Sequence, residues 1–289
     1  MKFTDYNSPE KAILNEAFNS LPYMDMWISS IVEGYIYGNF NVAYINEVEE
    51  TSFTEKYTLR YGEKHGEYKR LYLDGKIKEE GSYYRGKEDG ECRSFYNNGN
   101  IDVISYWKDG KMDGIIKQWF PDGQLSNIGE FRNSKAEGEH KMYYDDGNIM
   151  VIANFKDGKI DGEHKEWWGN GKIRAISYSK EGKKEGEYKA WWDNGNLWIE
   201  EYYIDGKEEG ECKQYFDDGN IMIISNFKDG KLDGEHKEWW NNGNLRIEEY
   251  YIDGKKEGEC KEWNYEGRLT VSNLYKDGEV IEVFTNLRD

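Results

Sequence analysis

The feature that most constrains this chain is a 24-residue repeat that runs without an insertion or deletion. Glycine recurs at positions 75, 99, 123, 147, 171, 195, 219, 243 and 267, and a second glycine series keeps the same interval from 66 to 258. Nine consecutive units follow the approximate pattern D-G-K-x-x-G-E-x-K-x-[WY]-[WYF]-x-[DN]-G-[NK]-[IL]-x-[VI]-x-x-x-[YF]-x. A fixed period of this length indicates one supersecondary unit per repeat, with each unit stacked on its neighbours.

Three of the units form a larger copied block. The stretch "YYDDGNIMVIANFKDGKIDGEHKEWW" from Tyr143 returns 72 residues later, from Tyr215, as "YFDDGNIMIISNFKDGKLDGEHKEWW", with only four of 26 positions changed. This similarity indicates that three units were duplicated together.

Each unit carries two turn signals. Asp-Gly pairs such as Asp157-Gly158 alternate with Asn-Gly or Asp-Gly pairs such as Asn170-Gly171, and such dipeptides supply the positive φ angles of tight hairpin turns. The runs between them are five to eight residues long and rich in Trp, Tyr, Ile and Val, which favours strands over helices. We therefore expect an all-β fold, an elongated array of nine β-hairpin repeats in a solenoid or twisted sheet.

The strand periodicity predicts one apolar face. Successive strand residues point to opposite sides of a sheet, so Ile149, Val151 and Phe155 are expected on one face, with Met150 and Asn154 on the other. The same assignment is expected for the equivalent residues 72 positions later.

Composition limits the partners. The 289 residues are 37% hydrophobic and 33% charged, as in a folded protein, and carry a formal net charge of -18. This charge disfavours nucleic acid and anionic membrane surfaces, because both bind through Lys and Arg. A basic protein partner is the expectation, and the oligomeric state is left open.

The sequence also suggests a compartment. No basic region followed by an apolar run opens the chain, and no segment approaches the roughly 18 apolar residues of a membrane helix. We expect cytoplasmic residence, with non-standard export left open.

One column of the repeat gathers histidine and cysteine. Counting by 24 from His164 gives Tyr68, Cys92, Ile116, His140, Tyr188, Cys212, His236 and Cys260. A zinc site is one interpretation, because His and Cys are the usual ligands. Tyr and Ile in the same column favour the other, a strand position that takes a medium-sized side chain. Column mates of successive repeats lie two strands, or about 9.5 Å, apart. We expect no metal site and no cofactor.

The repeated carboxylates indicate a charged ladder, not a catalytic site. Glu163 and Glu166 return as Glu235 and Glu238, and lysines alternate with them. A catalytic pair is normally built once, in a pocket that perturbs its pKa. Nucleophile-elbow, P-loop, dinucleotide-binding and zinc-protease motifs are absent from the sequence. We expect no enzymatic activity and name no catalytic residue.

Seven tryptophans are the candidate binding residues. Adjacent strand residues face opposite sides, so one ring of each pair is expected on the face opposite its partner, and exposed aromatic rings mark binding surfaces. The alternative is that the rings pack along the ladder. Trp198 departs from the Met and Arg residues that hold its column in the neighbouring repeats, which favours a contact role, with ordinary surface variation as the alternative. The candidates are Trp167, Trp168, Trp191, Trp192, Trp198, Trp239 and Trp240.

The two ends depart from the repeat. Residues 1–56 contain Ser8-Pro9-Glu10, a helix-start signal, followed by an apolar pattern that suits a short helix. We expect a helical or mixed cap there over the open strand edge, and the alternative is a recognition module. Residues 57–279 hold the nine repeats, and residues 280–289 are expected to form a closing strand.

The repeating G-K-x-x-G-E-x-K-x-W-[YW]-x-[DN]-G resembles the bacterial variant of the MORN repeat, found in YwqK-like antitoxin components. The resemblance covers about Tyr57 to Glu279 and implies a hairpin array used for protein association. The function expected is a non-catalytic scaffold, of the antitoxin or immunity type, that binds a cationic protein through an acidic, aromatic-bearing surface. The alternative is a repeat protein at the cell surface that binds glycan or choline-type ligands, since aromatic hairpin repeats also occur in such modules.

Overall fold

The computed structural model describes residues 53–60 and 63–286, all in strands and turns. A helical cap was expected in residues 1–56. Residues 53–56 begin the first strand, and the rest of that range lies outside the described residues. The described chain divides into two compact units. Unit 1 ends at Gly147 and adds Phe155–Lys159, and unit 2 comprises Asn148–Asn154 and the chain from Ile160.

Unit 1 is a series of antiparallel strands in which each main strand pairs with the next along the chain. Its strands are β1 (Phe53–Arg60), β2 (Glu63–Tyr72), β3 (Ile77–Tyr84), β4 (Lys87–Glu88), β5 (Gly90–Phe95), β6 (Ile101–Lys108), β7 (Lys111–Met112), β8 (Gly114–Trp119), β9 (Leu125–Arg132) and β10 (Lys135–Tyr143). Strand β11 (Ile149–Lys156) contributes residues to both units.

Unit 2 repeats the same antiparallel pattern. Its strands are β12 (Lys159–Trp167), β13 (Ile173–Lys180), β14 (Lys183–Lys184), β15 (Gly186–Trp191), β16 (Leu197–Ile204), β17 (Lys207–Glu208), β18 (Gly210–Tyr215), β19 (Ile221–Lys228), β20 (Lys231–Trp239), β21 (Leu245–Ile252), β22 (Lys255–Lys256), β23 (Gly258–Trp263), β24 (Leu269–Lys276) and β25 (Glu279–Asn286). The all-β hairpin fold is confirmed, and β25 lies where a closing strand was expected.

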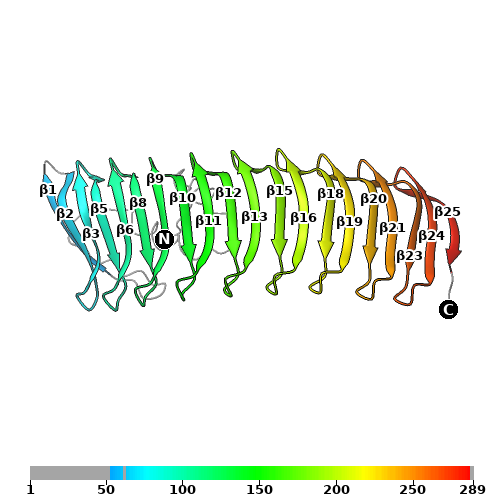
Figure 1. Cartoon of the computed structure of the whole chain (residues 1–289). Helices are drawn as coiled ribbons and strands as arrows, with labels where there is room; N and C mark the ends of the chain where they lie inside the picture. The colour runs from blue at the N-terminus through cyan, green and yellow to red at the C-terminus, as the bar shows by residue number, and fades with distance from the viewer. Residues whose placement is uncertain (1–52, 61–62, 287–289) are drawn as a thin grey trace, which may run out of the picture. The chain divides into compact units, whose positions relative to one another are not determined.

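The two turns of a repeat lie at opposite edges of the strands (Figure 1) and differ in geometry. Asp205 and Gly206 both have positive φ, 53° and 84°, which is the signature of a type I′ hairpin. In the other turn only the glycine, such as Gly171 at 80°, has positive φ. The Gly171 amide donates to the Trp168 carbonyl and the Trp168 amide to the Lys172 carbonyl, as in a hairpin closed by a glycine bulge.

The type I′ turns fasten each repeat to the one before it. The Gly206 amide donates to the Lys184 carbonyl at 2.9 Å, and the Asp205 amide donates to the Glu185 carboxylate at 2.8 Å. The carboxylate recurs in eight repeats, at Asp89, Asp113, Glu137, Asp161, Glu185, Glu209, Asp233 and Glu257. This column of capping carboxylates was not predicted, although it is visible in the sequence as an acidic residue before the second glycine of those repeats.

A β-bulge that recurs in eight repeats alters the predicted alternation of faces. Ile223 pairs with Gln214 but Ile221 pairs with Tyr215, so Met222 is an extra residue on its strand. A bulge of this kind re-aims the side chains beside it. The prediction that Ile221 shares a face with Ile223 is therefore wrong, and in the copy 72 residues earlier Val151 and Phe155 are buried whereas Ile149 is exposed.

The core lies along one face of the strands, called here the inner face. In unit 2 its buried cluster is Ala175, Ala190, Ile199 and Cys212, with Tyr188 and Phe227 packed against it. Three of the four, Ala175, Ala190 and Cys212, are small side chains.

Candidate binding surfaces

The histidine and cysteine column lies on the inner face. Tyr68, Cys92, Cys212 and Cys260 are buried, and the three thiols are free. Burial raises the pKa of Cys92 and of Cys212 to about 12, so these thiols stay protonated and poorly reactive. No group of three or more His, Cys, Asp or Glu side chains able to hold a metal ion occurs among the described residues. The column packs the sheet.

One arrangement on this face has the composition of a hydrolase triad. The hydroxyl of Ser225 lies 2.8 Å from Nδ1 of His236, whose Nε2 lies 3.2 Å from the carboxylate of Glu238. Only 4% of the Ser225 surface is exposed, so a substrate carbonyl cannot reach its hydroxyl at the distance that nucleophilic attack requires. These side chains satisfy one another's hydrogen bonds within the inner face.

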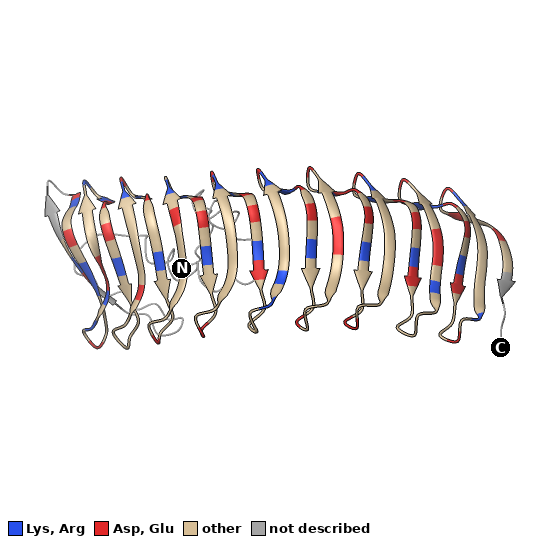
Figure 2. Ribbon diagram, in the orientation of Figure 1, with Lys and Arg blue, Asp and Glu red and all other residues tan. Residues whose placement is uncertain are grey.

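The opposite face carries the predicted charge ladder. Within single strands, Lys165 bridges Glu163 at 2.8 Å, Lys189 bridges Glu187 at 3.1 Å, and the pattern continues in later repeats. Figure 2 shows these acidic and basic bands following one another on successive strands. The glutamate side chains are about half exposed or more, so the pairs are solvated and individually weak.

Six of the seven candidate tryptophans are only half-buried, and three of them serve the repeat itself. The indole N–H groups of Trp168, Trp192 and Trp240 donate to backbone carbonyls of the following repeat, at 3.0 to 3.1 Å. Trp167, Trp191 and Trp239 end the preceding strands, where each pairs with an aliphatic residue. These contacts stabilise the packing of one repeat on the next, which explains much of the recurrence of tryptophan. A binding role for the six tryptophans stays a prediction.

Trp198 differs from the other six because 38% of its surface is exposed. It is the bulged residue of β16, between Leu197, which pairs with Trp191, and Ile199, which pairs with Ala190. Its ring contacts that of Trp192 in a tilted arrangement, with centroids 5.4 Å apart and planes at 47°. In two other repeats of unit 2 the bulged residue is arginine and covers the equivalent ring: Arg174 over Trp168 and Arg246 over Trp240.

Sequence reasoning missed a set of exposed side chains on the charged face. Tyr178, Tyr202 and Tyr250 share one column and are each about 45% exposed, and Ile204 and Ile252 beside two of them are about half exposed. The available signal was the "YYIDGK" of residues 202–207, which returns at 250–255 with isoleucine where five other repeats have lysine. These apolar side chains interrupt an otherwise charged surface.

The net charge is distributed unevenly between the units. Residues 160–286 contain 29 acidic and 18 basic side chains, a net charge of -11, whereas residues 53–147 contain 18 and 16, a net charge of -2. Since the Glu–Lys ladder is balanced, the excess in unit 2 comes from turn and inner-face carboxylates such as Asp193, Asp217 and Glu201.

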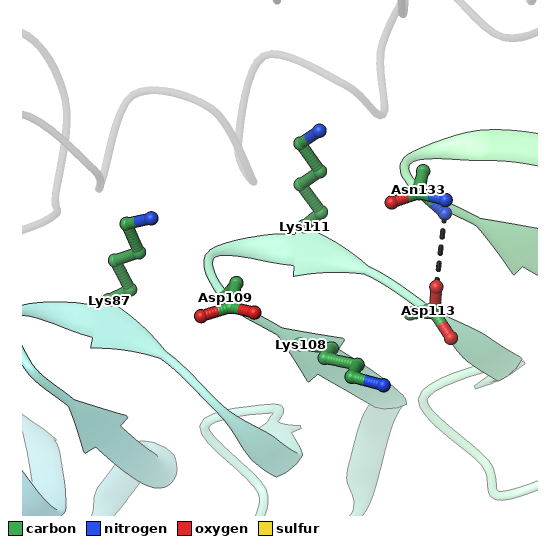
Figure 3. A pocket seen from close by; sticks show the side chains of 6 residues that line it. All are labelled: Lys87, Lys108, Asp109, Lys111, Asp113 and Asn133. Carbon is green, nitrogen blue, oxygen red and sulfur yellow. Dashed lines mark hydrogen bonds between the residues drawn. The ribbon is translucent and has the colours of Figure 1, made fainter.

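Polar hollows lie beside type I′ turns of unit 1. The larger, of about 460 Å³, is lined by Lys87, Lys108, Asp109, Lys111, Asp113 and Asn133. Figure 3 shows Asp113 accepting a hydrogen bond from the backbone amide of Asn133. Asp113 already caps a turn and the lysines are exposed, so this hollow differs from the enclosed, largely apolar pockets that bind small molecules.

These observations define a repeat protein of antiparallel β-hairpins that carries its distinctive side chains on exposed faces and bulges. The family described as MORN repeat variant matches eight segments, and the chain belongs to that family. The matched residues are 64–83, 88–111, 112–133, 136–157, 160–181, 184–205, 208–229 and 232–253. The strands of the ninth unit, which follow, keep the same pairing.

Other comparisons add little. A search of curated proteins returned no match. The chain resembles parts of two solved structures, "Crystal Structure of TcdB2-TccC3-Cdc42", at 13% identity and a TM-score of 0.19, and "Crystal Structure of TcdB2-TccC3", at 12% and 0.20. The matches cover 83% and 82% of this chain and 17% of each of those chains. In the described part of the chain no helix is long and apolar enough to span a membrane.

Proposed function

We propose that the protein is a non-catalytic interaction scaffold, of the antitoxin or immunity type, whose unit 2 binds a cationic protein. The observation that carries this proposal is the uneven charge, a net -11 on residues 160–286 against -2 on residues 53–147. An acidic surface speeds the encounter with a basic partner and repels acidic ones.

The exposed aromatic and aliphatic side chains of unit 2 can supply binding energy that charge alone does not. Large rings that become buried contribute most of the binding energy at protein interfaces, whereas exposed ion pairs contribute little. Tyr178, Tyr202, Tyr250 and Trp198 are such rings. Cytoplasmic residence belongs to the proposal and is supported by three free thiols, because disulfides are rare in that compartment.

Capture from a lysate of the protein's own host tests the proposal. The tagged full chain is incubated at low and at moderate salt, and retained proteins are quantified by mass spectrometry. We expect one near-stoichiometric basic protein that is lost as salt rises, since salt screens exposed charges beyond about 10 Å at 0.1 M.

The matched control for this capture replaces Glu163, Glu187, Glu211 and Glu235 by glutamine, which keeps shape and removes four negative charges. The same basic protein should be retained less at low salt. Retention that neither salt nor the glutamine variant changes would contradict an electrostatic scaffold. Retention of a glycan or a choline-type ligand, and of no protein, would favour the alternative function.

A further inference from the structure

The bulge position of each repeat forms one structural column. The bulged residue stands six positions after the second aromatic residue of the repeat, and in three repeats it is a cation that lies over the ring. Lys78 lies 5.8 Å from the ring centroid of Tyr72, Arg174 lies 4.8 Å from that of Trp168, and Arg246 lies 4.7 Å from that of Trp240. These repeats thus place their own cation on an aromatic face, a favourable cation–π contact.

Two of these cations are also neutralised. Arg174 lies 3.3 Å from the Glu166 carboxylate, and Arg246 lies 3.3 Å from the Glu238 carboxylate. Each of these repeats therefore holds a complete set of ring, guanidinium and carboxylate. The rings are held in place because their indole N–H groups donate to the backbone of the next repeat.

The repeat that follows Arg174 lacks both charged members of the set. Ala190 stands where Glu166 and Glu238 stand, and Trp198 stands where the arginines stand. Trp192 keeps its place, because its indole donates to the Tyr215 carbonyl at 3.1 Å. The result is a pair of rings in tilted contact, in which Trp192 is held in place and Trp198 is 38% exposed, with neither the arginine nor the glutamate of the other two sets.

We propose that the Trp192–Trp198 pair is a binding site for an arginine side chain of the partner protein. The inference rests on the proposed function, since it names a contact by which a cationic protein would dock. A guanidinium group fits because it is planar, stacks on aromatic faces and is weakly hydrated, and because the same sheet already places guanidinium groups on the rings of Trp168 and Trp240. The net charge of -11 on residues 160–286 draws such a side chain to unit 2.

Nuclear magnetic resonance of the full chain tests this site. The indole N–H signals of Trp192 and Trp198 are assigned with single Phe variants and followed during titration with N-acetyl-Gly-Arg-Gly-amide. We expect saturable shifts at these two signals. The same peptide with citrulline, which has the shape of arginine without its charge, should bind at least about tenfold more weakly.

A double variant supplies the matched control. Trp198→Arg combined with Ala190→Glu gives this repeat the sequence set of the repeats that hold Arg174 and Arg246, so the fold should be retained, as a thermal melt verifies. The ring of Trp192 is then covered by the protein's own introduced arginine, and arginine-peptide binding should weaken by about tenfold or more. The reverse pair, Arg174→Trp with Glu166→Ala, should create a second site at Trp168.

Three results would overturn the inference. They are an unperturbed Trp198 signal at saturating peptide, equal binding of the citrulline peptide, and tighter binding of choline than of the arginine peptide. If the tryptophan signals fail to respond while a basic protein is still captured in a salt-dependent manner, the site is wrong and the scaffold function stands. A response at Trp198 without any captured basic protein supports the site and contradicts the scaffold function.

Discussion

At the scale of single residues, the most regular device is the carboxylate that caps the next repeat's turn. In eight repeats an Asp or Glu side chain accepts the first amide of a type I′ turn 20 residues later. This contact explains why the residue before the second glycine is always acidic in those repeats. The residue type varies more in the first aromatic column and in the histidine column, because packing there requires only a side chain of suitable size.

Removing one capping carboxylate should destabilise the fold measurably. The Glu209 carboxylate accepts the Asp229 amide at 2.9 Å. Glu209→Ala should lower the free energy of unfolding by about 1 kcal/mol, as loss of a side-chain cap does at a helix terminus. Glu209→Asp is the control, because Asp161 and Asp233 make the same contact in other repeats. Urea denaturation that shows no difference between the two variants would argue against the cap.

The histidine column offers a test by pH. Burial lowers the pKa of His164, although the nearby Glu166 carboxylate acts in the opposite direction. The folded state therefore favours the neutral imidazole, and stability should decrease as pH falls through the unfolded value of about 6.5 toward the lower folded value. His164→Tyr, which introduces the residue that Tyr188 supplies in the next repeat, should lose less stability between pH 7 and pH 5.

The measurement for this prediction is chemical denaturation of both proteins at each pH, so that protonation of the carboxylates affects both alike. The double variant His164→Tyr/His236→Tyr should also leave metal content unchanged and the melting temperature at neutral pH nearly so. A clear loss of bound zinc would refute the interpretation of this column as a packing position.

At the scale of elements, the turns were predictable and the bulges were not. Asp-Gly and Asn-Gly pairs fix hairpin positions through φ, and even Asn133-Ser134, which lacks glycine, keeps two positive φ angles, 50° and 63°. The bulge position has no comparable sequence signal, because it is occupied by Lys, Asp, Ser, Met, Arg, Trp or Thr in different repeats. Its effect on facing residues explains why the position of Ile149 was predicted wrongly.

Alanine substitutions at two glycines of unit 2 separate the effect of backbone conformation on stability from that of side-chain contacts. A Cβ atom added at Gly243 or at Gly169 would meet nothing within 4 Å, but Gly243 has a φ of +86° and Gly169 has no positive φ. Gly243→Ala should therefore cost about 1 kcal/mol in stability. Gly169→Ala should be neutral or slightly stabilising. Thermal melts compare the pair, and equal effects would contradict a conformational role for the turn glycine.

At the scale of the whole molecule, the fold class, the repeat and its period followed from the sequence, whereas the surface side chains that distinguish one repeat from another did not. A period reports what every unit shares, so it predicts strands and turns. The proposed binding depends on departures from the period, and the exposure of those residues depends on three-dimensional packing. Trp198 was singled out as a departure, but Ile204, Ile252 and the column of Tyr202 were not.

The charge distribution belongs to the same scale. Because the Glu–Lys pairs of successive strands balance, changing one member of the ladder alters the net charge of unit 2 without disturbing the core. Four Glu→Gln changes at residues 163, 187, 211 and 235 make unit 2 less acidic. Four Lys→Gln changes at residues 165, 189, 213 and 237 make it more acidic. The two variants are a matched pair of opposite sign.

The most direct test of an acidic scaffold is the dissociation constant of the captured basic protein, measured by calorimetry at about 50 and about 300 mM salt. We predict at least about tenfold weaker binding at the higher salt, weaker binding by the Glu→Gln variant at low salt, and equal or tighter binding by the Lys→Gln variant. A dissociation constant that changes with neither salt nor the sign of the substituted charges would contradict the account.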